Sequence, residues 1–266
     1  MPETEIIESN VQFREAWKLY AQRSPYGEVF DREGLRFANA NQPWAFMNLA
    51  LLLGPVAGAS DLEHRARLAV NYFGSERIPW FLTASADWFS GNGDQVLRDL
   101  GLVRKLSLTG MVAERLAPPV RPLPEVEVRR IDSEATRTAL ADLNADSYGV
   151  PREWGRLAVG GAALWDTPLF GTIAYVRREP ASGTLAIPIG DVLYVGWVAT
   201  GKAYRGQGLA EVVIRKTLEE ATMATGLERT VLHATADGYP VYLRLGYRSV
   251  VDFPMYASLT EANAPR

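Results

Sequence analysis

Two hydrophobic patterns alternate along the chain, and together they predict an α/β (α+β) protein. Apolar residues recur with helical spacing in five segments, 11–23, 60–72, 94–100, 133–146 and 211–224. Apolar runs typical of strands occupy the segments 35–38, 45–53, 78–84, 103–111, 126–128, 162–165, 172–176, 192–199 and 230–235. Ser60 and Glu63 have the spacing of a capping box, which predicts that the second helix starts there.

The segment 205–210, Arg-Gly-Gln-Gly-Leu-Ala, lies where a strand pattern changes to a helical pattern. The N–H groups in the first turn of a helix lack partners, and the helix dipole places partial positive charge there. Glycines let an anion approach the backbone closely, and Arg205 adds a cation. The segment therefore predicts a site for a phosphate or pyrophosphate.

Related phosphate-binding motifs differ from this loop. It lacks the Gly-Lys-Ser/Thr ending of an ATP-binding P-loop and the third glycine of a dinucleotide fingerprint. Its Arg-x-x-Gly-x-Ala pattern, with the Tyr-x-x-x-Gly-aromatic pattern at 242–247, resembles the GNAT N-acetyltransferase family over roughly 126–259. The resemblance implies acetyl-CoA as cosubstrate. It also implies a mixed, mostly antiparallel central sheet flanked by helices, in which two cofactor strands splay apart.

The resemblance also implies which residues contact the cosubstrate. Backbone amides of the loop would bind the pyrophosphate, and the strand that precedes the loop would pair with the pantetheine arm. A backbone N–H near Trp197 or Val198 would face the thioester oxygen. The implied cofactor-binding residues are Trp197, Val198, Ala199, Arg205, Gly206, Gln207, Gly208, Leu209 and Ala210.

Tyr242 is the candidate general acid, because a phenol with a pKa near ~10 stays protonated at neutral pH and can protonate a departing thiolate. The alternative is that its ring only packs beneath the cofactor. Tyr239 is nearby, but its spacing to Gly246 does not fit the family pattern.

The sequence leaves the general base open. His233 lies in the strand 230–235 and titrates in a useful range, yet an isolated histidine in an apolar strand is typically a packed side chain. Asp191 precedes the cofactor strand and is a second candidate, with a solvated strand end as the alternative. Enzymes of the GNAT family often pass the amine proton to ordered water, which would need no single base.

The loop expected at 147–154 is the candidate acceptor site, because the resemblance places much of the acceptor pocket after the first helix. Tyr148 and Trp154 could form its walls, and Glu153 could attract an ammonium group. Ordinary packing between helices is the alternative reading of these three residues.

Four prolines between 118 and 124 cannot continue a helix or a central strand, so 118–125 is predicted to be a linker. The predicted domains are 1–117 and 126–266. The two halves have echoing motifs, with 97–102 matching 242–247 and 74–77 matching 226–229, which favours a tandem duplication over coincidence.

The N-terminal half departs from the cofactor motif. Its loop has no Arg-Gly-x-Gly, its helix begins with the carboxylates of Asp61 and Glu63, and Leu97 stands where the second half has Tyr242. Carboxylates at a helix start would repel a pyrophosphate. We therefore expect a degenerate GNAT-like half that binds no CoA, as in tandem GNAT proteins.

Composition narrows the functional classes. The chain has 266 residues and a formal net charge of −3, so its composition does not indicate nucleic-acid binding. It contains no cysteine, which excludes thiolate metal sites and a cysteine nucleophile. No signal peptide or spanning apolar run is seen, so we expect a cytoplasmic protein without metal or membrane partner.

The expected activity is direct transfer of an acetyl group to a primary amine, with a small molecule as the favoured acceptor. The alternatives are transfer of a longer acyl or an aminoacyl group, and a non-catalytic acyl-CoA-binding module. A homodimer is left open.

Overall fold

The computed structural model describes residues 3–89 and 91–258, which form two compact units. The first unit contains the chain up to Gly110 together with 250–258, and the second contains 111–249. These units divide the chain differently from the predicted domains 1–117 and 126–266. The reason is that two strands, β5 (Leu102–Ala113) and β11 (Arg248–Ser258), each begin in one unit and end in the other.

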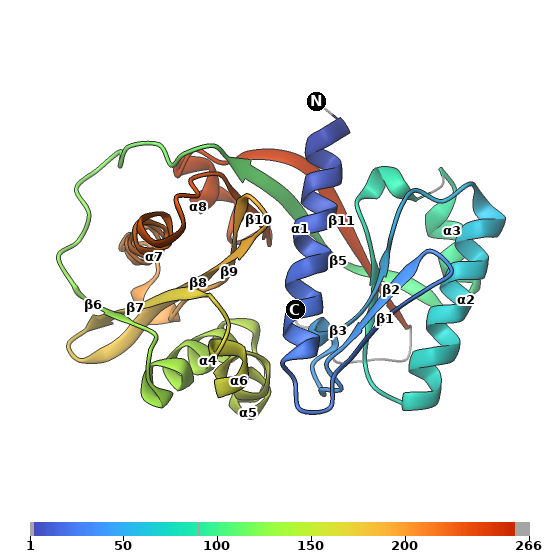
Figure 1. Ribbon diagram of the computed structural model, residues 1–266, viewed down its shortest axis with the longest axis horizontal. Coiled ribbons are helices and arrows are strands. Elements are labelled where there is room, and N and C mark those ends of the chain that lie inside the picture. The colour runs from blue at the N-terminus through green and yellow to red at the C-terminus, as the bar shows by residue number, and fades with distance from the viewer. Residues whose placement is uncertain (1–2, 90, 259–266) are drawn as a thin grey trace. The chain divides into compact units, whose positions relative to one another are not determined.

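The first unit is a mixed sheet with helices on both faces. Its sheet has the order β1-β2-β3-β4-β11-β5, in which β3 and β4 are parallel and the pairs β1–β2, β2–β3 and β4–β11 are antiparallel. Within this unit, α1 covers one face of the sheet, and α2 and α3 cover the other (Figure 1). Its other elements are α1 (Glu3–Gln22), β1 (Glu28–Arg32), β2 (Leu35–Asn39), β3 (Asn48–Leu52), α2 (Ala59–Glu76), β4 (Phe81–Thr83) and α3 (Gly93–Asp99).

The core of the first unit forms where the apolar stripe of α2 meets the sheet. Leu62, Ala66 and Phe73 lie on that stripe and pack with Phe37 of β2. Phe73 also stacks on Trp80, with ring centroids 4.8 Å apart. Burial of this stripe explains why an amphipathic segment of modest propensity is helical here.

The second unit is built in the same way. Its sheet has the order β5-β10-β9-β8-β7-β6, with β9 and β10 parallel and the pairs from β9 to β6 antiparallel. In this unit, α7 and α8 lie on one face and α4, α5 and α6 on the other (Figure 1). Its elements are β6 (Glu127–Arg130), α4 (Glu134–Tyr148), α5 (Arg152–Gly155), a π-helical turn (Arg156–Gly160), α6 (Ala162–Trp165), β7 (Phe170–Val176), β8 (Glu179–Ile189), β9 (Val192–Thr200), α7 (Leu209–Thr225), β10 (Thr230–Ala234) and α8 (Tyr239–Arg244).

The apolar stripe of α7 forms the core of the second unit on one face of the sheet. Ile214, Leu218 and Ala221 recur with helical spacing and pack with Leu193 of β9 and Leu232 of β10. On the other face, α4 starts with a capping box. Both helices contact β9, the strand that carries the predicted cofactor residues.

The two units repeat one order of elements. In the first unit, β3 and β4 are parallel with α2 between them, and α3 and β5 follow. In the second, β9 and β10 are parallel with α7 between them, and α8 and β11 follow. This correspondence agrees with the echoing motifs of the two halves.

Most of the predicted elements are present, but three segments have another secondary structure than predicted. Residues 162–165 form the helix α6 rather than a strand, because this alanine-rich run has no alternation and favours a helix. Residues 45–47 form a 3₁₀ turn before β3. The expected loop 147–154 is largely helical, since α4 continues through Tyr148 and α5 begins at Arg152.

Three strands were not predicted, namely β1, β8 and β11. The segment of β8 contains small residues and prolines, and most of its residues are buried, so it lacks the alternation of a half-buried strand. The segment of β11 also contains a proline, Pro254.

Candidate active site

The strand β9 is distorted by a bulge at the predicted oxyanion position. Its register with β8 passes from Leu185↔Gly196 to Gly183↔Ala199, so the two residues Trp197 and Val198 oppose a single residue of β8. Trp197 has a φ of 54°, a conformation that bulky residues rarely adopt. The bulge therefore bends the strand and reorients the backbone amides that the sequence singled out.

Buried polar side chains hold this bulge in place. The Nδ2 group of Asn144, a fully buried residue of α4, donates to the Trp197 carbonyl at 3.0 Å. The Thr184 hydroxyl donates to the Gly196 carbonyl at 3.1 Å. These two hydrogen bonds satisfy the carbonyl of Trp197 and the carbonyl of the residue before it. They therefore stabilise the strained backbone at Trp197.

The strands β9 and β10 are parallel over only a short distance. Their described pairing consists of Thr230↔Leu193 and Val231↔Tyr194, although β9 continues to Thr200. The two strands thus separate before the bulge, and the splayed arrangement expected for the cofactor strands is present.

The glycine loop joins the end of β9 to the start of α7. Gly206 and Gly208 have φ values of 76° and 84°, which favour glycine. The Val212 N–H donates to the Gly208 carbonyl, so the N–H groups of 208–211 have no acceptor within the helix. Arg205 is exposed, and its Nε donates to the Thr200 carbonyl at 3.3 Å. The loop therefore offers backbone donors and a cation together.

Tyr242 lies in α8 and belongs to the core cluster that also contains Leu193 and Val195 of β9. Val198, further along β9, packs against this cluster. Its ring contacts the Tyr247 ring edge-on, with centroids 5.8 Å apart. Burial raises the pKa of Tyr242 well above its usual value, and the nearby phenols of Tyr148 and Tyr247 add to the shift. Tyr242 therefore stays protonated over the whole neutral range.

His233 does not share the surroundings of Tyr242. Its neighbours Leu232 and Ala234 are in the core cluster with Tyr242, so by strand alternation His233 points to the opposite face of the sheet. There its Nδ1 lies 3.3 Å from the Tyr194 hydroxyl. Burial lowers the pKa of His233 to about 3, so the imidazole is neutral and a weak proton acceptor at pH 7.

Asp191 lies away from the bulge. With Gly190 it forms the exposed turn between Ile189 and Val192 of the β8–β9 hairpin. Trp197 lies six positions further along this extended strand, which corresponds to roughly 20 Å. Asp191 is a solvated strand end rather than a neighbour of the predicted reaction centre.

The three predicted acceptor residues are close in sequence but differ in exposure. Tyr148, the last residue of α4, is half-buried and close enough to Tyr242 to raise the pKa of that phenol. Trp154 is half-buried in α5, whereas the Glu153 side chain is exposed. Only Tyr148 is thus placed near another predicted site residue by an interaction in the structure.

Asn144 and Thr184 are site-positioning residues that the sequence did not single out. Asn144 is a polar residue on the apolar face of α4, beside buried Leu140 and Leu143. The sequence did contain one indication of this role, namely an asparagine on the apolar face of a predicted helix. A buried amide needs a hydrogen-bond partner, so such a residue is expected to bind another part of the chain.

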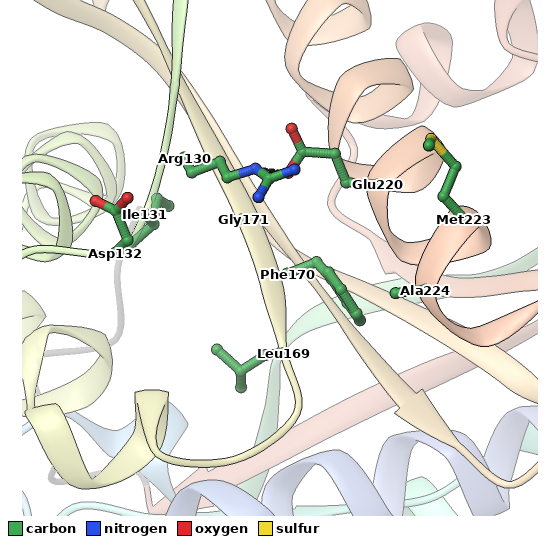
Figure 2. A pocket seen from close by; sticks show the side chains of 9 residues that line it. All are labelled: Arg130, Ile131, Asp132, Leu169, Phe170, Gly171, Glu220, Met223 and Ala224. Atoms are coloured by element: carbon green, nitrogen blue, oxygen red, sulfur yellow. Dashed lines mark ion pairs between the residues drawn. The ribbon is translucent and has the colours of Figure 1, made fainter.

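A separate cavity of about 390 Å³ opens on the second unit, between the β6–β7 edge and the last turns of α7. Figure 2 shows Phe170 in this cavity and the ion pair that joins Arg130 to Glu220 at 3.0 Å. None of the predicted site residues is among the residues that line it. The cavity is thus distinct from the region around the bulge and the glycine loop.

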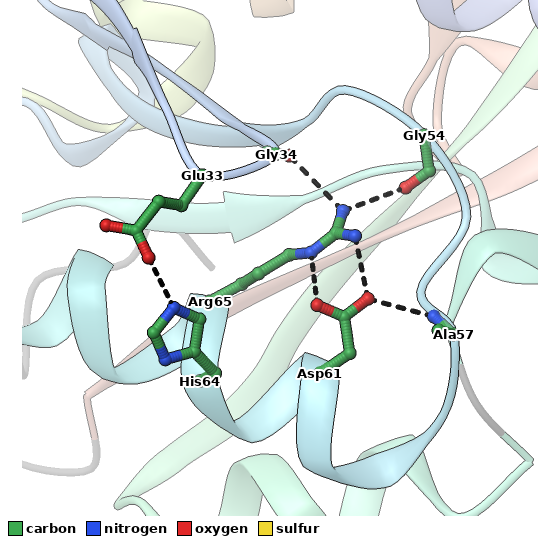
Figure 3. A network of polar contacts seen from close by, with 7 residues as sticks. All are labelled: Glu33, Gly34, Gly54, Ala57, Asp61, His64 and Arg65. Atoms are coloured by element: carbon green, nitrogen blue, oxygen red, sulfur yellow. Dashed lines mark hydrogen bonds and ion pairs between the residues drawn. The ribbon is translucent and has the colours of Figure 1, made fainter.

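The corresponding loop of the first unit is occupied by the protein's own side chains. The Asp61 carboxylate accepts from the Ala57 N–H at 2.9 Å and pairs with Nε and Nη2 of Arg65 (Figure 3). Arg65 also donates to the carbonyls of Gly34 and Gly54, each at 3.3 Å. An internal carboxylate therefore binds a backbone amide of the loop that precedes this helix.

This network also corrects the predicted capping box. The helix α2 begins before Ser60, and its N-cap is Gly58, which makes no side-chain cap. Asp61, rather than Ser60, satisfies an amide of the loop.

Comparison with known proteins identifies the fold of this site. Residues 127–247 match the model of the acetyltransferase (GNAT) family. No curated protein sequence matches the chain.

Solved structures resemble nearly the whole chain. A GCN5-related N-acetyltransferase from Kribbella flavida has a TM-score of 0.71 at 16% identity, covering 94% of this chain and 95% of its own. A GCN5-related N-acetyltransferase-like protein from Streptococcus suis has a TM-score of 0.56 at 17% identity, covering 93% and 98%. A tandem GNAT protein from the clavulanic acid biosynthesis pathway has a TM-score of 0.53 at 15% identity, covering 84% and 77%.

The family match over residues 127–247, together with these solved structures, indicates an acyltransferase. More particularly, residues 127–247 match the GNAT acetyltransferase family, and the chain as a whole has the fold of solved GNAT proteins. Within the described residues, no helix is long and apolar enough to cross a bilayer. Nor do these residues contain a group of three or more His, Asp or Glu side chains placed to hold a metal ion.

The Asp61 network predicts a local contribution to stability. Asp61→Ala should lower the free energy of unfolding by about 1–2 kcal/mol, because the Ala57 amide and Arg65 lose their acceptor. The matched control is Glu63→Ala, since the Glu63–Arg67 pair is exposed and such pairs contribute less than about 1 kcal/mol. Urea denaturation measures both, and equal midpoints for the two variants would contradict the prediction.

The same network predicts a pH dependence. The hydrogen bond from Arg65, and then that from Ala57, lower the pKa of Asp61 below its usual value. The stabilisation is therefore fully present above about pH 4, the unfolded-state pKa, and is lost as pH falls through the lower folded pKa. The stability difference between wild type and Asp61→Ala should shrink on acidification.

Loss of the amide that holds the bulge should impair catalysis. In Asn144→Ala the Trp197 carbonyl loses its donor, the strained residue can relax, and the amides beside it shift. We expect kcat for acyl transfer to fall by about ten- to a hundredfold. Thr138→Ala, at a half-buried position six residues earlier in α4, is the matched control and should keep its kcat. An unchanged kcat in folded Asn144→Ala would contradict this role.

Proposed function

We propose that the protein is an acetyl-CoA-dependent N-acetyltransferase that transfers the acetyl group directly to a primary amine, with a small molecule as acceptor. The observation that carries the proposal is the bulged end of β9, which separates from β10 and leads into the glycine loop at the start of α7. The GNAT family model over 127–247 supports the choice of cosubstrate.

The residues of the loop fit the phosphate end of acetyl-CoA. The left-handed backbone at Gly206 and Gly208 needs glycine, and the N–H groups of 208–211 have no acceptor in the helix. These donors lie at the positive end of the dipole of α7, which favours a pyrophosphate. Arg205 is exposed beside them and adds a positive charge.

Acetyl-CoA supplies an acyl thioester, and groups of the protein would stabilise the charges that develop on it during transfer. A backbone N–H of the bulge would donate to the thioester oxygen and stabilise the negative charge that develops there. The amine nitrogen forms a bond to the acyl carbon while the bond from that carbon to sulfur breaks. The Tyr242 hydroxyl would give its proton to the departing thiolate, and the raised pKa keeps this phenol protonated until the thiolate forms.

The proton of the amine needs another route. His233 is a poor base, since its pKa is lowered to about 3 and it points to the face opposite Tyr242. Asp191 is in the distant hairpin turn. We therefore propose that water accepts the amine proton, as the sequence reading allowed.

For the acceptor end, we propose the region around Tyr148. Its half-buried phenol lies near Tyr242, and the α5 residues Trp154 and Glu153 follow it in the chain. An aromatic wall with a nearby carboxylate suits a small organic ammonium group.

Binding is the first test of the cosubstrate. Calorimetric titration with acetyl-CoA should give a stoichiometry near one per chain, because Asp61 occupies the corresponding loop of the first unit. Arg205→Glu should weaken binding by at least about tenfold through charge repulsion. Arg23→Glu, at an exposed position of the first unit, is the matched control and should bind as wild type does.

Two outcomes would go against this proposal. Absence of binding to any CoA species would remove acetyl-CoA as cosubstrate, and two sites per chain would show that the first unit is also competent. A preference for a longer acyl-CoA would retain the mechanism and change the donor.

Kinetics test the proton donor. Tyr242→Phe removes only the hydroxyl and should lower kcat by about a hundredfold or more, with little change in the affinity for acetyl-CoA. Tyr239→Phe is a matched control in the same helix, because the Tyr239 hydroxyl pairs with Ser249 at 2.8 Å. If both variants retain wild-type kcat, Tyr242 has only a packing role.

A further inference from the structure

The proline-rich segment between the two halves is held against the glycine loop. Residues 117–124, called the strap below, contain no helix or strand. Prolines at 118, 119, 122 and 124 restrict its backbone, so little entropy is lost in keeping it in place. The strap passes beside α7 on its way from β5 to β6 (Figure 1).

The first end of the strap is fixed to the turn that follows Tyr242. The Ala117 N–H donates to the Leu245 carbonyl at 2.8 Å. The Ala117 carbonyl accepts from the Arg215 guanidinium of α7 at 2.6 Å. A side chain at Gly246, where φ is 95°, would come within 3.0 Å of Ala117. The glycine of the Tyr-x-x-x-Gly-aromatic motif thus lets the strap approach closely.

The second end of the strap lies on the phosphate loop. The Arg121 guanidinium donates to the Gly206 carbonyl at 3.5 Å. A Cβ atom at Gly208 would be 3.4 Å from Pro124 and 3.6 Å from the Arg121 guanidinium. The strap therefore contacts both glycines of the loop, at the carbonyl of Gly206 and beside the Cα of Gly208.

The charge of Arg121 is not neutralised by the protein. Arg121 is exposed, and among the described residues no carboxylate forms an ion pair with it. By contrast, Arg215 beneath the strap is paired with Glu211 at 2.7 Å. Within the part of the chain that the structure describes, Arg205 has no acidic partner either, so Arg121 and Arg205 place two guanidinium groups beside one set of backbone donors. Planar guanidinium groups suit phosphate oxygens.

We propose that the strap is part of the cosubstrate site and that Arg121 binds a phosphate group of CoA, either in the pyrophosphate or at the 3′ position. This inference rests on the proposed function, since it assumes that CoA binds at the glycine loop. It adds a binding residue outside both motifs of the family pattern. It also gives the linker between the halves a role in recognition.

The test is calorimetric titration of the full-length protein with acetyl-CoA. Arg121→Gln should raise the Kd by about tenfold, and Arg121→Lys should recover part of that loss because it restores the charge. Arg23→Gln makes the same change at an exposed position of the first unit and should keep the wild-type Kd. The difference between wild type and Arg121→Gln should shrink at high salt.

Titration with 3′-dephospho-CoA identifies the phosphate. If Arg121 binds the 3′-phosphate, wild type and Arg121→Gln should bind dephospho-CoA equally. If it binds the pyrophosphate, the tenfold difference should persist. Either result supports the inference.

An unchanged Kd for acetyl-CoA in Arg121→Gln, with normal binding by the wild type, would overturn the inference and leave the proposed function intact. A lower melting temperature in that variant with an unchanged Kd would assign the strap a purely structural role. Absence of binding by the wild type would instead reject the proposed function on which the inference rests.

Discussion

The proposed chemistry depends on one strained residue, Trp197, and on the buried amide that holds it. A tryptophan with positive φ persists only where its surroundings favour that conformation. Here the Asn144 amide bonds to the carbonyl of Trp197, and Thr184 satisfies the carbonyl before it. The bulge changes the direction of β9, and the glycine loop continues from the redirected strand. Asn144 and the loop are thus coupled through the backbone of a single strand.

The site could be predicted from the sequence to the extent that its signals are local. Glycines with positive φ at 206 and 208, the helix start behind them and the Tyr242 motif all depend on residues adjacent in the chain. Asn144 could not be found in this way, because its partner lies 53 positions later and only the packing of α4 on β9 brings them together. The role of His233 could not be decided from the sequence for the same reason. Its side chain points to the face opposite Tyr242, and this follows only when Leu232 and Ala234 are known to lie in the core with Tyr242.

The fold shows the same limit. Amphipathic helices such as α2 and α7 were predicted because one face is apolar, whereas β8 was missed because it is buried on both faces and contains prolines. The unit boundaries differ from the prediction because a proline-rich segment was taken to divide the domains. In the structure that segment is packed within the second unit, through Ala117 and Arg121.

The strands β5 and β11, which each begin in one unit and end in the other, have a consequence for how the protein folds during synthesis. The sheet of the first unit needs β11, whose Met255 and Tyr256 pair with Thr83 and Leu82 of β4. More than half of the chain separates these partners, so the first unit cannot complete its sheet while the ribosome is still translating the second. Folding in simple N-to-C order is therefore unavailable to this architecture, and contacts this distant in sequence slow folding. A gene split at the proline-rich segment would yield an N-terminal half with an open strand edge, prone to association.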